Sequence, residues 1–302
     1  MVPLVPCHTV AQSADAYLWE IRHRDNVLYI FGGIHFGRAD FYPLPASVEN
    51  AYHISKGLAV EVDLSSTKVI VQMEALVKLA PPHKLRQMIS ADLMRDLTEQ
   101  LSQFDLVGRR VTGLKPWALA FTLNFLEAER LGYDSIWGVD RYFLARAKRE
   151  KKSIVQLETV RDQFADVDAM SQDDQLELLL VMVQKLSNGT LADEVQQMAD
   201  AWHRGDWETF DGDWRDRSAQ HPILGEVDRK LISNRNAKMA SGLSKLLMGK
   251  KTFFAVVGVE HVVGEGSVID LLQQKGFDVK RIGYPLSSHA SGVVEGANEV
   301  SH

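Results

Sequence analysis

The sequence predicts an α/β (α+β) fold, in which helices wrap a mixed central sheet and a helical insertion separates two halves that each carry a Gly-x-x-His motif. Apolar runs bounded by turn residues indicate buried strands near both ends of the chain, at residues 27–31, 58–62 and 253–257. The middle of the chain instead carries apolar residues three and four positions apart, which is typical of amphipathic helices. Strands that alternate with helices in this way indicate a layered α/β domain.

The first elements read as a hairpin followed by a crossover unit. Residues 17–22 and 26–33 are predicted strands joined by a short polar turn at 23–25. Because the second strand is apolar on both faces, we expect it inside the sheet and covered on each side. A proline-containing loop, a short helix at 47–55 and a strand at 58–62 complete the crossover.

Helices are predicted over most of the remaining chain. Four segments show helical periodicity, namely residues 69–79, 93–104, 117–131 and 139–149. A predicted strand at 154–157 follows them. Several helices follow, with expected breaks at Gly189 and Gly205 and a last helix from about 224 to 247. The final elements are a strand at 252–257, a helix at 267–275 and a strand at 279–284.

We expect one domain over residues 17–285, with a helical cap contributed by approximately residues 65–135 and 160–249. Residues 286–302 are small, polar and glycine-containing, which predicts a disordered tail. Residues 1–16 resemble the end of a secretory signal peptide without its charged start, or else a disordered leader. The signal-like reading predicts a periplasmic or secreted protein, and the other reading leaves it cytoplasmic.

The composition argues against several functional classes. The formal net charge of −6 disfavours a nucleic-acid-binding protein, which would carry a basic face. No run of 18 apolar residues occurs, so no transmembrane segment is predicted. The single cysteine, Cys7, permits neither an internal disulfide nor a cysteine-rich zinc site. The sequence has no phosphate-binding loop, no Gly-x-Ser-x-Gly elbow and no His-Glu-x-x-His motif, and it leaves the oligomeric state open.

Two predicted strands end in the same Gly-x-x-His pattern, at residues 32–35 and 258–261. A glycine at the end of a strand lets the backbone turn sharply or approach a ligand closely. The histidine then lies just past the carboxyl end of the strand, where open α/β sheets bind ligands. One such histidine is more often structural, but two copies favour a functional pair. We therefore expect His35 and His261 to meet at a metal ion.

Glu61 is the third candidate, because it lies inside the apolar run 58–62. A buried carboxylate needs a cation or hydrogen-bond donors, so it is either part of a structural ion pair or a metal ligand or general base. Glu158 ends its own strand and could join the same cluster, and Asp63 could orient Glu61. Arg235 and Asn236, near the middle of a long helix, could reach into the site, although a solvated helix face is the alternative.

Two imidazoles and one carboxylate suit zinc, manganese, cobalt or iron, with coordination positions left open for water. Such an ion lowers the pKa of a bound water molecule and polarises a carbonyl group, so it supports hydrolysis at neutral pH. His35, His261 and Glu61 therefore predict a catalytic metal site.

The same motifs resemble those of the TraB/PrgY/GumN family. The similarity covers residues 17–284, nearly the whole predicted domain, and is closest to the bacterial GumN-like branch. The segments that carry it are residues 30–35, 40–45, 61–63, 138–140, 157–159, 201–202, 205–206, 235–236, 255–261, 263–264 and 276–279.

The resemblance implies both a fold and an activity. The family is related in fold to erythromycin esterase-like and haem-binding ChaN-like proteins. It includes the Tiki proteins, metalloproteases that cleave secreted signalling proteins and depend on manganese or cobalt. By this resemblance His35, His261 and Glu61 would hold a divalent metal ion, manganese or cobalt in the first place and zinc or iron otherwise.

The sequence thus predicts a metal-dependent hydrolase, a peptidase that takes a peptide or protein substrate. The ion would activate water for attack on a carbonyl, Glu61 would serve catalysis as well as metal binding, and Glu158 or Arg235 would orient groups or stabilise developing charge. The alternative is a non-catalytic protein that binds haem, a metal or a peptide within a polysaccharide or pheromone-type signalling system.

Overall fold

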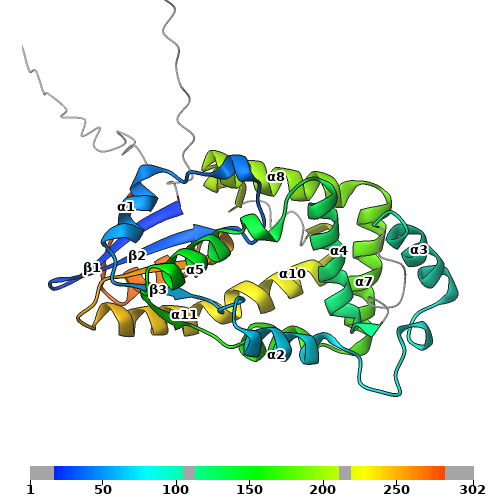
Figure 1. Ribbon diagram of the computed structural model, residues 1–302. Coiled ribbons are helices and arrows are strands. Elements are labelled where there is room, and N and C mark those ends of the chain that lie inside the picture. Colours follow the sequence, from blue (N-terminus) through cyan, green and yellow to red (C-terminus); the bar gives the residue numbers. More distant parts are fainter. Residues whose placement is uncertain (1–16, 105–112, 211–218, 283–302) are drawn as a thin grey trace, which may run out of the picture.

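The structure is a computed structural model that describes residues 17–104, 113–210 and 219–282. A six-stranded sheet occupies one end of the molecule and a group of helices the other (Figure 1). The predicted leader at 1–16 and tail at 286–302 lie outside the described residues. None of the described helices combines the length and the hydropathy that crossing a membrane requires.

The sheet is mixed, which confirms the predicted fold class. Its strands are arranged in the order β4-β3-β5-β2-β1-β6. They are β1 (Leu18–His23), β2 (Asn26–Gly33), β3 (Gly57–Val60), β4 (Ser153–Gln156), β5 (Phe253–Gly258) and β6 (Asp278–Ile282). Strands β4, β3, β5 and β2 are parallel to one another, whereas β1 is antiparallel to both β2 and β6.

The predicted hairpin is confirmed, and its second strand lies inside the sheet as expected. His23 pairs with Asn26, and the turn between them places Arg24 in the left-handed region, at φ 53°. Strand β2 pairs with β1 on one side and with β5 on the other. Its residues Ile30 and Phe31 point to opposite faces, and both are fully buried.

Helices cover both faces of the sheet (Figure 1). On one face, α1 (Ala46–Ile54) and α5 (Val139–Arg149) pack over Phe254, whose ring contacts Tyr52 and Phe143. The other face carries α11 (Asn234–Leu247) and α12 (Val268–Gln274). Small residues such as Ala59 and Ala255 are paired on that second face, so α11 can approach the strands closely.

The helical end of the molecule has a hydrophobic core of its own, separate from the core around the sheet. Its helices are α2 (Thr67–Val77), α3 (Ala91–Leu101), α4 (Pro116–Arg130), α6 (Val160–Asp168), α7 (Gln172–Ser187), α8 (Thr190–Arg204) and α10 (Pro222–Asp228). Gly189 and Gly205 flank α8 in the left-handed conformation, as expected for helix breaks. The second half of α8 leaves this group, because Ala199 and Trp202 pack into the core of the sheet.

The helix predicted at 224–247 has an interruption. A π-helical turn, η6 (Arg229–Ser233), lies between α10 and α11. A π-turn inserts extra residues per turn and rotates the side chains that follow it, and such turns are frequent at functional sites. Here the π-turn ends two residues before Arg235.

Candidate functional site

The parallel strands deliver the predicted site residues to one edge of the sheet. Strands β2 and β5 are neighbours in parallel register, with Gly33 opposite Gly258, so the two Gly-x-x-His motifs leave the sheet side by side. Glu61 directly follows β3 on the other side of β5, and Glu158 follows the adjacent strand β4. This is the carboxyl edge, where α/β sheets bind ligands.

Three of these residues surround Gly258. A Cβ atom placed on Gly258 would lie 3.4 Å from Glu61 Oε1, 3.4 Å from His261 Cδ2 and 3.8 Å from His35 Nε2. The structure therefore brings His35, His261 and Glu61 to a common point, as the sequence predicted. That space is open because residue 258 has no side chain.

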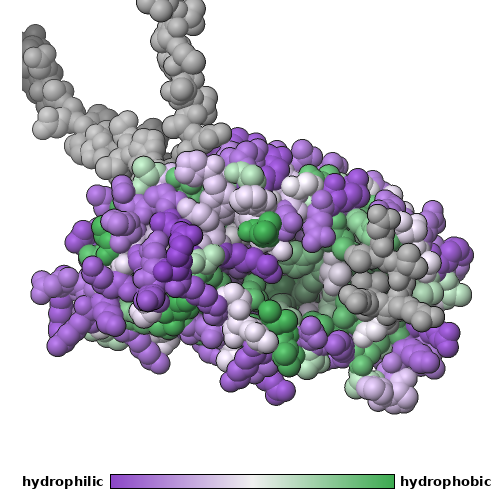
Figure 2. All heavy atoms as spheres, viewed as in Figure 1, coloured by the Kyte–Doolittle hydropathy of each residue, from purple (hydrophilic) through white to green (hydrophobic). Residues whose placement is uncertain are grey.

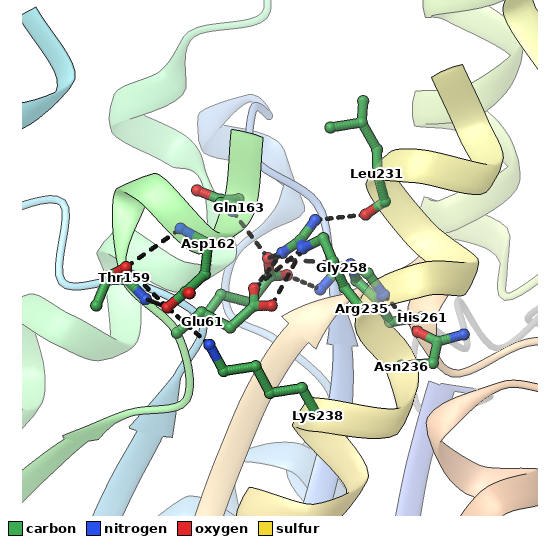
Figure 3. Close-up of polar contacts among 11 residues, drawn as sticks. Glu61, Thr159, Asp162, Gln163, Leu231, Arg235, Asn236, Lys238, Gly258 and His261 are labelled. Carbon is green, nitrogen blue, oxygen red and sulfur yellow. Dashed lines mark hydrogen bonds and ion pairs between the residues drawn. The ribbon is translucent and has the colours of Figure 1, made fainter. Parts of the chain in front are cut away.

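Glu61 is ionised and held by three donors (Figure 3). Its Oε1 accepts a hydrogen bond of 2.6 Å from the Gly258 N–H, and its Oε2 accepts one of 2.6 Å from Arg235 Nη2 and one of 3.0 Å from Gln163 Nε2. Burial by itself would raise the pKa of Glu61, but His261, Arg235 and His35 together hold it well below its usual range. Glu61 thus forms the buried ion pair that was the alternative to a metal ligand, with Arg235 as its partner. This ion pair lies at the candidate metal site.

Arg235 binds two buried carboxylates at once (Figure 3). Its Nη2 lies 2.6 Å from Glu61 Oε2 and 2.6 Å from Glu158 Oε2, and its Nε donates to Glu158 at 3.0 Å. Its Nη1 donates to the carbonyl oxygen of Leu231, in the π-turn, at 2.5 Å. The guanidinium is buried, so the alternative of a solvated helix face is wrong. Burial and the charge of Glu61 raise the pKa of Glu158, although Arg235 opposes them.

His261 is a buried, neutral imidazole whose Nε2 faces Glu61. Its Nδ1 lies 2.7 Å from Asn236 Oδ1, while Asn236 Nδ2 donates to the carbonyl oxygen of Gly266 at 2.9 Å. The second bond fixes the orientation of the amide, so Nδ1 carries the proton and Nε2 keeps its lone pair. Burial, assisted by Arg235 and His35 and opposed by Glu61, lowers the pKa of His261 to about 4. Nε2 lies 4.0 Å from Glu61 Oε2.

His35 is half-exposed at the mouth of the site, with 47% of its side chain accessible. Its Nδ1 lies 3.6 Å from Asp140 Oδ1, a buried oxygen that has no hydrogen-bond partner among the described residues. Desolvation would lower the pKa of His35, but the nearby carboxylates of Asp140 and Glu61 outweigh it and raise that pKa above its ordinary value. The two histidines therefore differ in protonation, since His35 favours the charged form and His261 the neutral form.

A comparison with known families covers nearly all of the described chain. The model of the TraB/PrgY/gumN family matches residues 17–281. The chain belongs to this family. Both Gly-x-x-His motifs and all residues of the site lie inside the matched range.

Proteins similar to this TraB/PrgY/gumN chain occur in bacteria and in animals. The protein YbaP of Escherichia coli is 24% identical over 246 residues, which cover 81% of this chain and 87% of YbaP. The metalloprotease TIKI2 of Xenopus tropicalis is 23% identical over 319 residues, which cover 89% of this chain and 60% of TIKI2. The metalloprotease TIKI1 of Danio rerio is 22% identical over 93% of this chain and 66% of TIKI1. No solved structure matches, so the erythromycin esterase-like and ChaN-like fold relationship stays a prediction.

The site of this TraB/PrgY/gumN chain contains the types of donor found in metal centres, but these donors are too far apart to coordinate one ion as they stand. No group of three or more His, Cys, Asp or Glu side chains in the described chain is close enough to hold an ion as it stands. Two ligands of one ion, each about 2.0–2.2 Å from it, are separated by roughly 3–4 Å. The distance of 4.0 Å between His261 Nε2 and Glu61 Oε2 is near that range.

Two further observations favour a fit. Each histidine turns its Nδ1 toward a side-chain oxygen, of Asn236 or of Asp140, as metal-binding histidines usually do. The cavity lined by His35, Glu61 and Gly258 measures about 20 Å³, enough for one water molecule or ion. The donor set therefore fits a single divalent ion.

The sequence did not identify every residue of the site. Gln163 on α6 was missed, and Asp140 was noted only within the family resemblance. Asn236 was expected to reach into the site beside Arg235, but without its contact to His261. Asp63 does not orient Glu61, because its carboxylate binds Ser65 and Lys148 instead. Gln163 gave no signal, since it lies among polar residues on an amphipathic helix.

Replacing Asp140 with asparagine is expected to lower the pKa of His35. The variant removes the closest negative charge, so the pKa should fall toward the ordinary histidine value of about 6.5. An NMR titration of the histidine rings in metal-free protein measures this, with exposed His53 as the internal control. An unchanged His35 titration would show that Asp140 does not act on this ring.

Proposed function

We propose that the protein is a metal-dependent hydrolase that cleaves peptide bonds. The convergence of His35, His261 and Glu61 around Gly258 carries the proposal, because these are the side chains that a catalytic divalent ion requires. The relationship to proteins named metalloproteases supports the same chemistry. Export to the periplasm or cell surface remains a prediction from residues 1–16.

His261 Nε2, Glu61 and His35 would hold the ion. A divalent ion in this position would lower the pKa of a water molecule and polarise the scissile carbonyl group. His261 needs no proton loss to act as a ligand, whereas His35 must first give up the proton that Asp140 and Glu61 stabilise. Manganese or cobalt is the proposed metal, as the family resemblance implies, with zinc or iron as alternatives.

Arg235 and Glu158 would act by positioning. Arg235 Nη2 fixes Glu61 Oε2, and Glu158 holds the guanidinium through Nη2 and Nε. Gln163 and the Gly258 N–H complete the set of donors that orient the Glu61 carboxylate. The arrangement leaves one further role for Arg235, since its positive charge lies beside Glu61 and would stabilise negative charge that develops there.

A substrate could reach this edge of the sheet from the hollow in the molecular surface. Figure 2 shows the hollow between α5 and α4, over α10, with hydrophobic residues along much of its wall. Strand β2 points its carboxyl end toward this helical half of the molecule (Figure 1). An apolar hollow that leads to polar groups is the usual form of a ligand site.

Elemental analysis tests the metal. Wild-type protein supplied with manganese, cobalt, zinc or iron should retain one ion per chain. The variants His35→Ala and His261→Ala should bind the ion with an affinity lower by about 10-fold or more, and so lose most of the bound metal. His53→Ala, an exposed histidine on α1, is the matched control and should keep the wild-type metal content.

Two results would separate the alternatives. If His35→Ala and His261→Ala both retain the wild-type metal content, the metal site is wrong. If the metal depends on both histidines but no member of a peptide library is cleaved, the protein is a binding protein instead. A haem is disfavoured in advance, because the cavity lined by His35, Glu61 and Gly258 measures only about 20 Å³.

A further inference from the structure

A second depression lies on the outer surface of α5, beside the proposed catalytic site. It measures about 550 Å³. We call it the α5 groove, and its lining residues are Tyr42, Pro43, Glu49, Ile136, Trp137, Arg141, Tyr142, Ala145, Arg146 and Arg149. None of these residues belongs to the metal site described above.

The charge of the α5 groove is opposite to that of the protein as a whole. The chain has a formal net charge of −6, yet the groove contains three arginines and a single glutamate. The carboxylate of Glu49 is already paired, because it binds Arg146 and accepts a hydrogen bond from Tyr142 at 2.7 Å. Within the described part of the chain, Arg141 and Arg149 have neither an ion pair nor a hydrogen bond, and both are exposed. The groove therefore offers two free guanidinium groups.

The spacing along α5 gives the groove its length. Arg141, Ala145 and Arg149 are four residues apart, so they form one stripe on the helix surface. Eight residues of helix span about 12 Å, the length of roughly four residues of extended peptide. The small side chain of Ala145 leaves the stripe hollow between the two charges.

The amino-terminal end of the groove presents exposed apolar side chains on a rigid turn. Ile136 and Trp137 are 63% and 40% exposed. Their turn is fixed by the Asp134 carboxylate, which accepts from the Ile136 N–H at 2.8 Å, and by Tyr42, whose hydroxyl donates to the Trp137 carbonyl at 2.8 Å. Exposed aromatic and aliphatic side chains on a rigid support are suited to anchoring a partner.

The same turn is locked to the loop that carries His35. Gly37 and Asp134 exchange backbone hydrogen bonds of 3.1 and 2.8 Å. A Cβ atom on Gly138 would lie only 2.6 Å from the His35 carbonyl oxygen. In the first turn of α5, Asp140 faces His35 while its neighbour Arg141 lines the groove. A chain bound in the groove would therefore end next to the site.

We infer that the α5 groove binds an acidic segment of the peptide substrate, with an apolar residue over Ile136 and Trp137 and carboxylates on Arg141 and Arg149. Arginine suits this ligand because its planar guanidinium can bind a carboxylate through two hydrogen bonds. Since the chain as a whole has a formal net charge of −6, a basic groove also disfavours binding of an acidic peptide in a wrong register. The inference names the substrate class of the proposed peptidase and so rests on that proposed function.

Peptide binding to metal-free protein tests the groove without any dependence on catalysis. Fluorescence anisotropy compares a labelled peptide that contains phenylalanine and several aspartates with its twin in which asparagine replaces aspartate. The aspartate peptide should bind more tightly to wild-type protein. The double variant Arg141→Glu/Arg149→Glu should weaken it by at least about fivefold, as should Ala145→Trp, which fills the groove without a change of charge.

The double variant Lys84→Glu/Arg86→Glu is the matched control, because it makes the same charge change at two exposed positions in the helical half. It should leave binding unchanged. Equal binding of the two peptides to wild-type protein would overturn the inference. So would unchanged binding of the aspartate peptide to Arg141→Glu/Arg149→Glu. Failure of the proposed function would appear elsewhere, as a metal content that does not depend on His35 and His261.

Discussion

Replacing Arg235 with methionine is expected to lower the free energy of unfolding by about 3–5 kcal/mol. The change removes the guanidinium that binds both Glu61 and Glu158, which are only 5% and 4% exposed. Two buried carboxylates would then lie close together without the guanidinium that binds both, and breaking a buried ion pair from one side leaves the full cost of desolvation. Urea unfolding of metal-free protein measures the difference.

A control and a rescue make this result specific. Arg95→Met removes an exposed arginine that pairs with Asp92 on α3, and it should change the stability little. Adding Glu61→Gln and Glu158→Gln to Arg235→Met should recover much of the lost stability, because the uncompensated charges disappear. If the triple variant is less stable than the single one, repulsion between the carboxylates is not the cause.

The sequence predicted the convergence of the site because the relevant signals are local. Each Gly-x-x-His motif marks the carboxyl end of an apolar strand, and Glu61 follows a third one. Parallel strands in a sheet end at the same edge, so any parallel arrangement of these three strands brings the side chains together. The strand order itself was not predictable, since β5 enters between β2 and β3 from almost 200 residues further along the chain than β3.

The missing parts of the site depend on contacts between distant helices. Periodicity at 3.6 residues per turn cannot locate the π-turn that aims Arg235 at Glu61, because the turn interrupts that periodicity. Asp140 reaches His35 only because Gly138 allows the start of α5 to pack against the His35 carbonyl. Gln163 has the sequence environment of a solvated helix face, and its bond to Glu61 follows from the position of α6 alone.

Gly258→Ala is expected to remove the metal while leaving the fold intact. The backbone of Gly258, at φ −54° and ψ 140°, is accessible to alanine. The new methyl group would make ordinary contacts of 3.4–3.8 Å with Glu61, His261 and His35, so it requires little movement. It would nevertheless occupy the space between the proposed ligands. We expect the metal affinity to fall by about 10-fold or more, with the urea unfolding midpoint of metal-free protein nearly unchanged.

Two other glycines separate this effect from a general loss of stability. Gly113→Ala places the same methyl group in open space and should alter neither property. Gly32→Ala would put a Cβ atom 2.6 Å from Val262 Cγ2 and 3.1 Å from the Val259 backbone, so it should destabilise the fold by strain between β2 and the second motif. Metal loss in Gly258→Ala together with a wild-type unfolding midpoint can arise only if the space beside Gly258 is where the ion binds. If Gly258→Ala binds metal as the wild-type protein does, the ion lies elsewhere, and the convergence of His35, His261 and Glu61 serves only the structure.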